Sequence, residues 1–345
     1  MDGMVGDDEE TDLAGDIATA SPGWEAIEAA LRDVYGDLQP LHWGSDPAAR
    51  LGGDEPLDGI SAYRAERGRP HWHLVTFGLS ELYRKELEEP SISGFGLELT
   101  LRLARPPDEA QPPRWALAML RHLAGYVDRS GQVLEPGHHL NANGPIARDR
   151  DTALSGLLFV ADPELPPIET PNGRVEFVQA VGVTLDELVA IEAWDSARFA
   201  ELLATRDPLH VTDLARTSVL ADPATAAAVR AATDRDGSSM GALSTERLQV
   251  TGDGRALELA VSPQIAGYLG RLMHGRLLHE RPLTVRAPHI EVLFEPAPVA
   301  EWKRDGEAIV VDTTPALARE IAGTVGARPG VYGFRALPGF TIRVQ

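Results

Sequence analysis

His71 and His73 stand two residues apart in a segment, residues 71–77, that is rich in aromatic and β-branched residues. Side chains alternate across a strand, so the two imidazoles would share one face, which is metal-ligand spacing if a third ligand comes from elsewhere. Histidines that are hydrogen-bonded at a sheet edge would give the same pattern, and we favour this interpretation because no third ligand stands at a recognisable spacing. We therefore predict no metal and no cofactor.

A serine nucleophile is the second chemistry to consider. Residues 237–241 read Gly-Ser-Ser-Met-Gly, which fits the G-x-S-x-G pattern of a nucleophile elbow. That turn needs a buried strand before it, whereas the preceding residues here are Ala-Ala-Thr-Asp-Arg-Asp. No spacing organises the pairs Asp149/Asp151 and His138/His139 into a site, and the sequence contains no Walker loop, HExxH or EF-hand loop. A hydrolase or metal enzyme is therefore a distant alternative.

Acidic residues dominate the 345-residue chain, which carries a net charge of −20 and no cysteine. Seven of the acids lie in residues 1–20, where there is no lysine or arginine, and we expect a disordered acidic tail there. The remaining acidic excess disfavours nucleic acid and anionic membranes as partners and favours a basic protein. The absence of cysteine excludes disulfides and thiolate-bound metals.

The cellular compartment is inferred from the lack of a membrane-spanning segment and of a signal peptide in the sequence. No apolar run approaches the length of a membrane span, and the N-terminus is acidic where a signal peptide would be basic. We therefore expect a cytoplasmic protein without membrane association. Lysine occurs only at positions 85 and 303, while arginine, alanine and glycine are plentiful, which suggests GC-rich coding and a bacterial source.

Helical and strand periods alternate without a regular βαβ rhythm, which indicates an α+β fold. The first helix should begin at Ser21 and Pro22, an N-cap followed by proline, and end before Pro40. Thr184 and Glu187 are three apart and suggest a capping box. Further helices are predicted at residues 115–127, 184–191, 195–204 and from 262, and strands at 72–77, 97–103, 155–161, 174–182, 257–261, 283–286, 290–294, 309–312 and 340–344.

Composition changes between residues 221 and 243, where an alanine-rich stretch gives way to Asp, Gly and Ser with little to bury. We expect an accessible connection between two lobes here. The predicted division is an N-terminal lobe of residues 21–236 and a smaller C-terminal lobe of residues 237–345.

Short motifs follow one another in a fixed order from about Pro56 to Gly241. They include residues 71–83 (HWHLVTFGLSELY), 93–103 (SGFGLELTLRL), 113–115, 124–127, 162–163, 170–173, 181–184, 212–213 and 236–238. Together they resemble the signature of the Suppressor of fused family, and residues 271–276 are similar to the arginine-rich helix of its second lobe.

This resemblance implies two lobes with mixed sheets flanked by helices, in a protein that binds other proteins and is not an enzyme. In eukaryotic members the lobes close on an extended peptide of a zinc-finger transcription factor, which adds as a β-strand in the cleft. Matching that cleft by motif implies that Tyr126, His138 and Asp162 are partner-binding residues on its wall. His138 replaces an acidic residue that engages a histidine of the peptide, so we do not expect the eukaryotic peptide to be the ligand.

Bacterial members of the family are thought to serve largely as immunity proteins that bind and neutralise toxins. The resemblance therefore suggests a cytoplasmic protein-binding module with a toxin as its partner, and a basic toxin would match the acidic surface. The alternative is a regulator that binds an endogenous bacterial protein.

Overall fold

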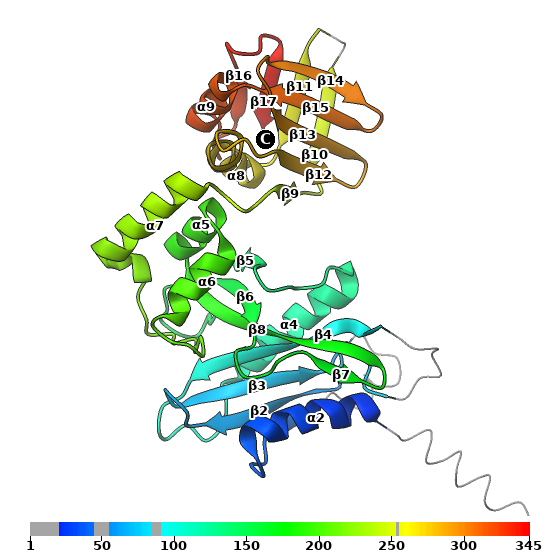
Figure 1. Cartoon of the computed structure of the whole chain (residues 1–345), viewed down its shortest axis with the longest axis vertical. Coiled ribbons are helices and arrows are strands. Elements are labelled where there is room, and N and C mark those ends of the chain that lie inside the picture. The colour runs from blue at the N-terminus through cyan, green and yellow to red at the C-terminus, as the bar shows by residue number, and fades with distance from the viewer. Residues whose placement is uncertain (1–20, 45–54, 84–90, 253–254) are drawn as a thin grey trace, which may run out of the picture. The chain divides into compact units, whose positions relative to one another are not determined.

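Figure 1 shows the computed structural model of the chain, which describes residues 21–44, 55–83, 91–252 and 255–345. The chain divides into two compact units: unit 1 is Met1–Leu188 with Ala200–Ser218, and unit 2 is Val189–Phe199 with Val219–Gln345. The predicted acidic tail lies outside the described residues. Within the described ranges, no helix combines the length and apolar character that a membrane crossing requires.

Unit 1 is built on one eight-stranded sheet. Its strands are β1 (Leu41–Gly44), β2 (Gly59–Ala65), β3 (His71–Phe77), β4 (Ile92–Ala104), β5 (His139–Asn141), β6 (Leu154–Ala161), β7 (Ile168–Thr170) and β8 (Gly173–Thr184). They lie in the order β1-β2-β3-β4-β8-β6-β5, and β7 pairs with β8 beside this path. β4 and β8 are parallel, while the other neighbours are antiparallel, so the sheet is mixed.

Helices cover both faces of this sheet (Figure 1). On one face, Ile27 and Leu31 of α2 (Pro22–Tyr35) pack with Val75, Phe77 and other apolar residues. On the other face, the apolar stripe of α4 (Arg114–Ser130) packs against the leucines of β4. Because both faces are covered, β3 is buried along its whole length. The predicted helices and strands of this region are confirmed.

β3 corrects one expectation. The sequence placed His71 and His73 at a sheet edge, but β3 lies between β2 and β4 and both imidazoles are completely buried. The prediction of an edge was wrong because a strand that is covered on both faces and paired on both sides has the same local composition as an edge strand. β4 shows the same burial on both faces, since Glu98, Thr100 and Arg102 are as inaccessible as the leucines between them.

Unit 2 contains two sheets around one apolar core. The four-stranded sheet has the order β10-β11-β17-β16 and the five-stranded sheet has the order β14-β15-β13-β12-β9. The strands are β9 (Ala242–Ser244), β10 (Leu248–Gly252), β11 (Leu257–Val261), β12 (Leu283–Ala287), β13 (Ile290–Pro296), β14 (Glu301–Asp305), β15 (Ala308–Thr313), β16 (Gly330–Gly333) and β17 (Phe340–Val344). Helices α8 (Pro263–Leu272) and α9 (Pro315–Thr324) contribute to the same core. Each begins with proline after a hydroxyl N-cap, Ser262 or Thr314.

The remaining α-helices of the described residues are α5 (Leu185–Ala193), α6 (Ser196–Ala204) and α7 (Pro223–Asp236), and two shorter helical segments are η1 (Val219–Ala221), a 3-10 helix, and η2 (Met273–Leu277), a π-helix. α7 occupies most of the segment in which an accessible connection was predicted. Its N-terminus is capped by the Asp222 carboxylate, which accepts from the backbone N–H groups of Ala224 and Thr225. This helix belongs to unit 2, whereas the sequence predicted the change of lobe after residue 236.

Candidate functional site

Arg102, near the C-terminal end of β4, organises a polar cluster inside unit 1. Its Nη1 donates to Oδ2 of Asp162 at 2.7 Å and its Nη2 donates to Oδ1 at 2.9 Å, so the ion pair is bidentate. Neither side chain has any exposed area. The guanidinium also donates to Glu164, at 3.1 Å, and to Gln179 on β8. We call Arg102, Asp162, His73, Gln179 and Glu164 the buried polar cluster.

The carboxylate of Asp162, which follows β6, is saturated with hydrogen bonds. Besides Arg102, it accepts from the Thr100 hydroxyl at 2.7 Å and from the backbone N–H groups of Glu164 and Leu165 at 2.9 and 3.0 Å. Burial alone would raise the pKa of Asp162, but the contacts with His73 and Arg102 outweigh it and hold the pKa well below its usual range. Asp162 is therefore ionised at neutral pH.

His73 lies opposite Arg102 in the β3–β4 ladder and joins Asp162 to α2. Its Nε2 is 3.1 Å from Oδ2 of Asp162, and its Nδ1 is 2.7 Å from the Tyr35 hydroxyl. Burial, followed by the charge of Arg102, lowers the pKa of His73 to about 4. The imidazole is therefore neutral, donating from Nε2 to Asp162 and accepting from Tyr35 at Nδ1.

The hydrogen bonds of His71 and His73 compete with the metal site considered for these two residues. Both ring nitrogens of His73 already have partners, and Nδ1 of His71 is 2.7 Å from the Arg69 carbonyl oxygen. Within the part of the chain that the structure describes, no three His, Asp or Glu side chains gather closely enough to hold an ion. In the interior of the sheet, His73 is hydrogen-bonded through both ring nitrogens and His71 through Nδ1.

The serine motif of residues 237–241 forms a turn between α7 and β9. Ser238 is buried and donates to the Glu192 carbonyl oxygen at 2.6 Å, while Ser239, the central serine of the motif, is exposed. A nucleophile elbow runs from a strand into a helix, and this turn runs from a helix into a strand. These contacts give the motif a structural role at the start of the five-stranded sheet.

The three predicted partner-binding residues have different surroundings. Tyr126, on α4, is 42% exposed and donates to Oε1 of Gln132 at 2.5 Å. The His138 side chain is 50% exposed, with Nε2 3.7 Å from Oε2 of Glu135. Asp162 is buried in the polar cluster. Tyr126 and His138 can therefore meet a partner directly in this conformation, while the role of all three in binding stays a prediction.

His138 leads into β5, the last strand in the sheet order of unit 1. The Phe159 N–H donates to the His138 carbonyl at 2.8 Å, and the Ala142 N–H donates to the Ser155 carbonyl at 2.9 Å. Antiparallel pairs alternate between bonded and non-bonded residues, so Asn141 directs its backbone N–H and C=O away from β6. No described strand pairs with this side of β5.

Sequence reasoning missed the polar residues of β4. Glu98 is completely buried and accepts from the Thr76 hydroxyl at 2.6 Å, the Gly78 N–H at 2.9 Å, and the Ser80 N–H and hydroxyl at 3.0 and 2.7 Å. Burial raises the pKa of Glu98 to about 7. The sequence pattern that could have revealed these residues is the alternation of Glu98, Thr100 and Arg102 with leucines along β4.

Comparison with known proteins identifies this architecture. A sequence profile of the Suppressor of fused protein (SUFU) family matches residues 53–217, which include all of the buried polar cluster. The human and mouse Suppressor of fused homologs are each 34% identical over 242 residues, or 65% of this chain and 50% of theirs. A chain from the crystal structure of the Sufu–Fu complex is 33% identical, covering 60% of this chain and 96% of that one with a TM-score of 0.54. The chain belongs to the Suppressor of fused family.

Solved relatives extend the likeness in fold beyond the profile. Drosophila Suppressor of fused gives a TM-score of 0.76 at 22% identity, covering 94% of this chain and 97% of that chain. The predicted Suppressor of fused-like α+β fold is thereby confirmed. Proteins of the family are generally binding proteins rather than enzymes. The chain spans about half the length of the curated human and mouse relatives that it matches.

Proposed function

We propose that the chain binds an extended segment of a partner protein at the open side of β5. The observation that carries this proposal is the backbone of Asn141, which points away from β6 at the end of the sheet. An added strand would take its backbone hydrogen bonds from β5 and its side-chain specificity from the surroundings. The sequence predicted binding in a cleft between the lobes. The binding surface proposed here consists only of residues of unit 1.

The three predicted residues enter this proposal in two roles. Tyr126 and His138 are exposed and would contact the partner, as aromatic side chains commonly do at interfaces. Asp162 would act indirectly, because its carboxylate holds Arg102, His73 and the backbone after β6 in place. Truncating Asp162 should therefore destabilise unit 1, and any loss of binding would follow from that.

We propose that the partner is a basic bacterial toxin and that the protein confers immunity to it. The net charge of −20 supports this choice of partner, since it would steer a basic protein toward the surface and discriminate against acidic ones. Co-expression with a toxin encoded beside the gene should restore growth of a sensitive bacterium. Capture of a host regulator, together with failure to protect against the neighbouring toxin, would favour the regulatory alternative.

Asn141→Pro should weaken binding of the identified partner at least about tenfold relative to Asn141→Ala, because only proline removes the outward N–H. The β6 ladder should survive in both variants, since its bonds come from the neighbouring residues of β5. Both variants also lose the bond from the Asn143 N–H to the Asn141 side chain, so the comparison isolates the backbone donor. Titration calorimetry would measure the difference. Equal affinities would remove strand addition at β5 from the proposal.

Tyr126→Ala should weaken partner binding by about 1–2 kcal/mol without lowering the melting temperature. Tyr83→Ala is the matched control, because Tyr83 is also 42% exposed and donates to a surface side chain, Oδ1 of Asp58, at 2.9 Å. Binding measurements and thermal melts on both variants separate the interpretations. A lowered melting temperature for Tyr126→Ala alone would mean that this tyrosine stabilises α4, and equal affinities would place it outside the interface.

A further inference from the structure

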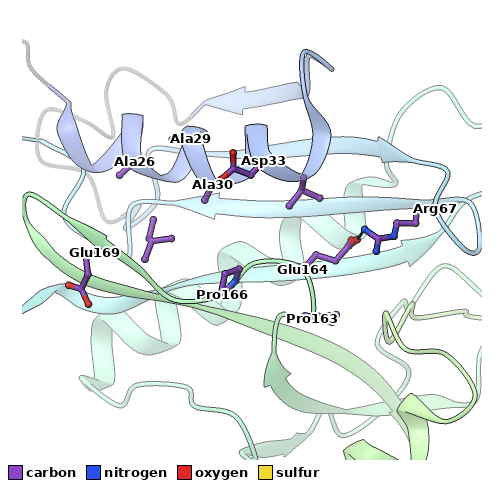
Figure 2. A pocket seen from close by; sticks show the side chains of 11 residues that line it. Ala26, Ala29, Ala30, Asp33, Arg67, Pro163, Glu164, Pro166 and Glu169 are labelled. Atoms are coloured by element: carbon purple, nitrogen blue, oxygen red, sulfur yellow. Dashed lines mark hydrogen bonds and ion pairs between the residues drawn. The ribbon is translucent and has the colours of Figure 1, made fainter.

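A groove of about 680 Å³ runs between α2 and the loop that follows β6 in unit 1 (Figure 2). Its volume lies in the range of roughly 300–1,000 Å³ that is usual for ligand pockets. The α2 wall includes the small side chains of Ala26, Ala29 and Ala30, and the facing wall includes Pro163 and Pro166. The alanine and proline side chains are apolar and either short or fixed, so little of their conformational freedom would be lost when a ligand covers them.

The charges that line this groove are mostly negative. Asp33 projects from α2, Glu164 lies toward one end and Glu169 lies toward the other, while Arg67 is the only basic residue among the described residues that line the groove (Figure 2). Arg67 Nη1 is 2.7 Å from Oε1 of Glu164. Outside the lining, Arg174 Nη1 is 3.8 Å from Oε1 of Glu169. Three carboxylates beside the alanine and proline side chains match a segment in which basic and small apolar side chains alternate.

Glu164 is held in place for such a contact. Its side chain is only 9% exposed, and Arg102 of the buried polar cluster donates to its Oε2 at 3.1 Å. The Arg67 side chain, in contrast, is 79% exposed, so its pairing with Glu164 contributes little to stability. An incoming guanidinium can replace Arg67 at a carboxylate whose position is already fixed, which limits the ordering cost of binding.

We propose that this groove binds a basic, extended segment of a partner protein, with guanidinium or ammonium groups on Asp33, Glu164 and Glu169 and small side chains on the alanines of α2. The chain's own residues 1–20 do not fit this chemistry, because they carry seven acids and no lysine or arginine. A second copy of the chain is disfavoured by its net charge of −20. The surface is separate from the β5 edge, so it would add a second contact to a partner or bind a different one.

The probe is a fluorescein-labelled peptide with three Arg-Ala repeats, and fluorescence anisotropy measures its binding to the full chain. We expect saturable binding of the peptide. The double variant Asp33→Asn/Glu169→Gln should raise the Kd about tenfold, and raising NaCl from about 50 to about 300 mM should also weaken binding. Glu25→Gln, which removes an exposed charge from α2 outside the groove, should change the Kd less than about twofold. Loss of affinity in Glu25→Gln equal to that in the double variant would overturn the proposal, because it would show attraction to net charge alone.

Filling the groove provides a test that leaves its charges intact. Ala29→Tyr places a large side chain in the channel, and Ala231→Tyr makes the same change at an exposed position of α7. Only Ala29→Tyr should abolish peptide binding, with similar melting temperatures for both variants. Unchanged affinity in Ala29→Tyr would contradict docking in the groove. Asn141→Pro should leave peptide binding unaffected, which separates this surface from the proposed strand addition at β5.

Discussion

Arg102→Met is expected to lower the free energy of unfolding of unit 1 by about 3–5 kcal/mol, because it removes one partner of a buried ion pair and leaves the other. Asp162 would keep its bonds from Thr100 and from backbone N–H groups but would lose both N–H donors of the guanidinium. Gln179 and Glu164 would lose a donor as well. Urea unfolding followed by tryptophan fluorescence would measure the loss.

Arg67→Met is the matched control for this prediction. Arg67 also pairs with Glu164 but is 79% exposed, so its removal should cost less than about 0.5 kcal/mol. The double variant Arg102→Met/Asp162→Asn should be less destabilised than the sum of its two single variants, by roughly 0.5–3 kcal/mol, because it leaves no buried carboxylate at position 162. Additive losses would show that packing, rather than the ion pair, explains the effect of Arg102.

The sequence predicted those parts of the fold that local patterns encode. α2 and α4 have apolar residues at helical spacing, and α8 begins with a serine N-cap and a proline, so all three could be located. The short strands β1, β5, β7, β9 and β16 escaped prediction because three or four residues show no period. α7 escaped because it buries only Val229 and Ala232, and its alanine-rich sequence was interpreted as a connection.

The site was less predictable because its contacts join residues far apart in the chain. Arg102 and Asp162 are sixty positions apart, and their meeting depends on how β4 and β6 flank β8. The family resemblance drew attention to Asp162, but its burial depends on Arg102, His73 and the loop that follows β6. Tyr126 lies on a helix with an apolar stripe, and its exposure in the structure shows that it can meet a partner.

Two buried ionisable groups in unit 1 should make opposite contributions to the pH dependence of stability. The pKa of His73 is lowered from 6.5 to about 4, so its contribution is fully present above pH 6.5 and is lost as the pH falls toward 4. The pKa of Glu98 is raised from 4.5 to about 7, so its contribution is present below pH 4.5 and is lost as the pH rises toward 7. Each full shift corresponds to about 3 kcal/mol, and the two changes largely cancel between pH 4.5 and 6.5.

Glu98→Gln should remove the contribution of Glu98 to the pH dependence of stability and leave that of His73. The amide oxygen can accept from Gly78 and Ser80 as the carboxylate does, and the amide N–H can donate to the Thr76 hydroxyl oxygen, so the local geometry should persist. Between about pH 8 and about pH 4, the variant should lose about 3 kcal/mol more stability than the unmodified protein, because protonation of His73 is no longer offset by protonation of Glu98. Urea unfolding at a series of pH values would measure this, with Glu25→Gln on the surface of α2 as the control. If the free energy of unfolding of Glu98→Gln and of the unmodified protein changed with pH in parallel, Glu98 would be ionised in the folded state throughout this range. Its four hydrogen bonds would then outweigh the effect of burial on its pKa.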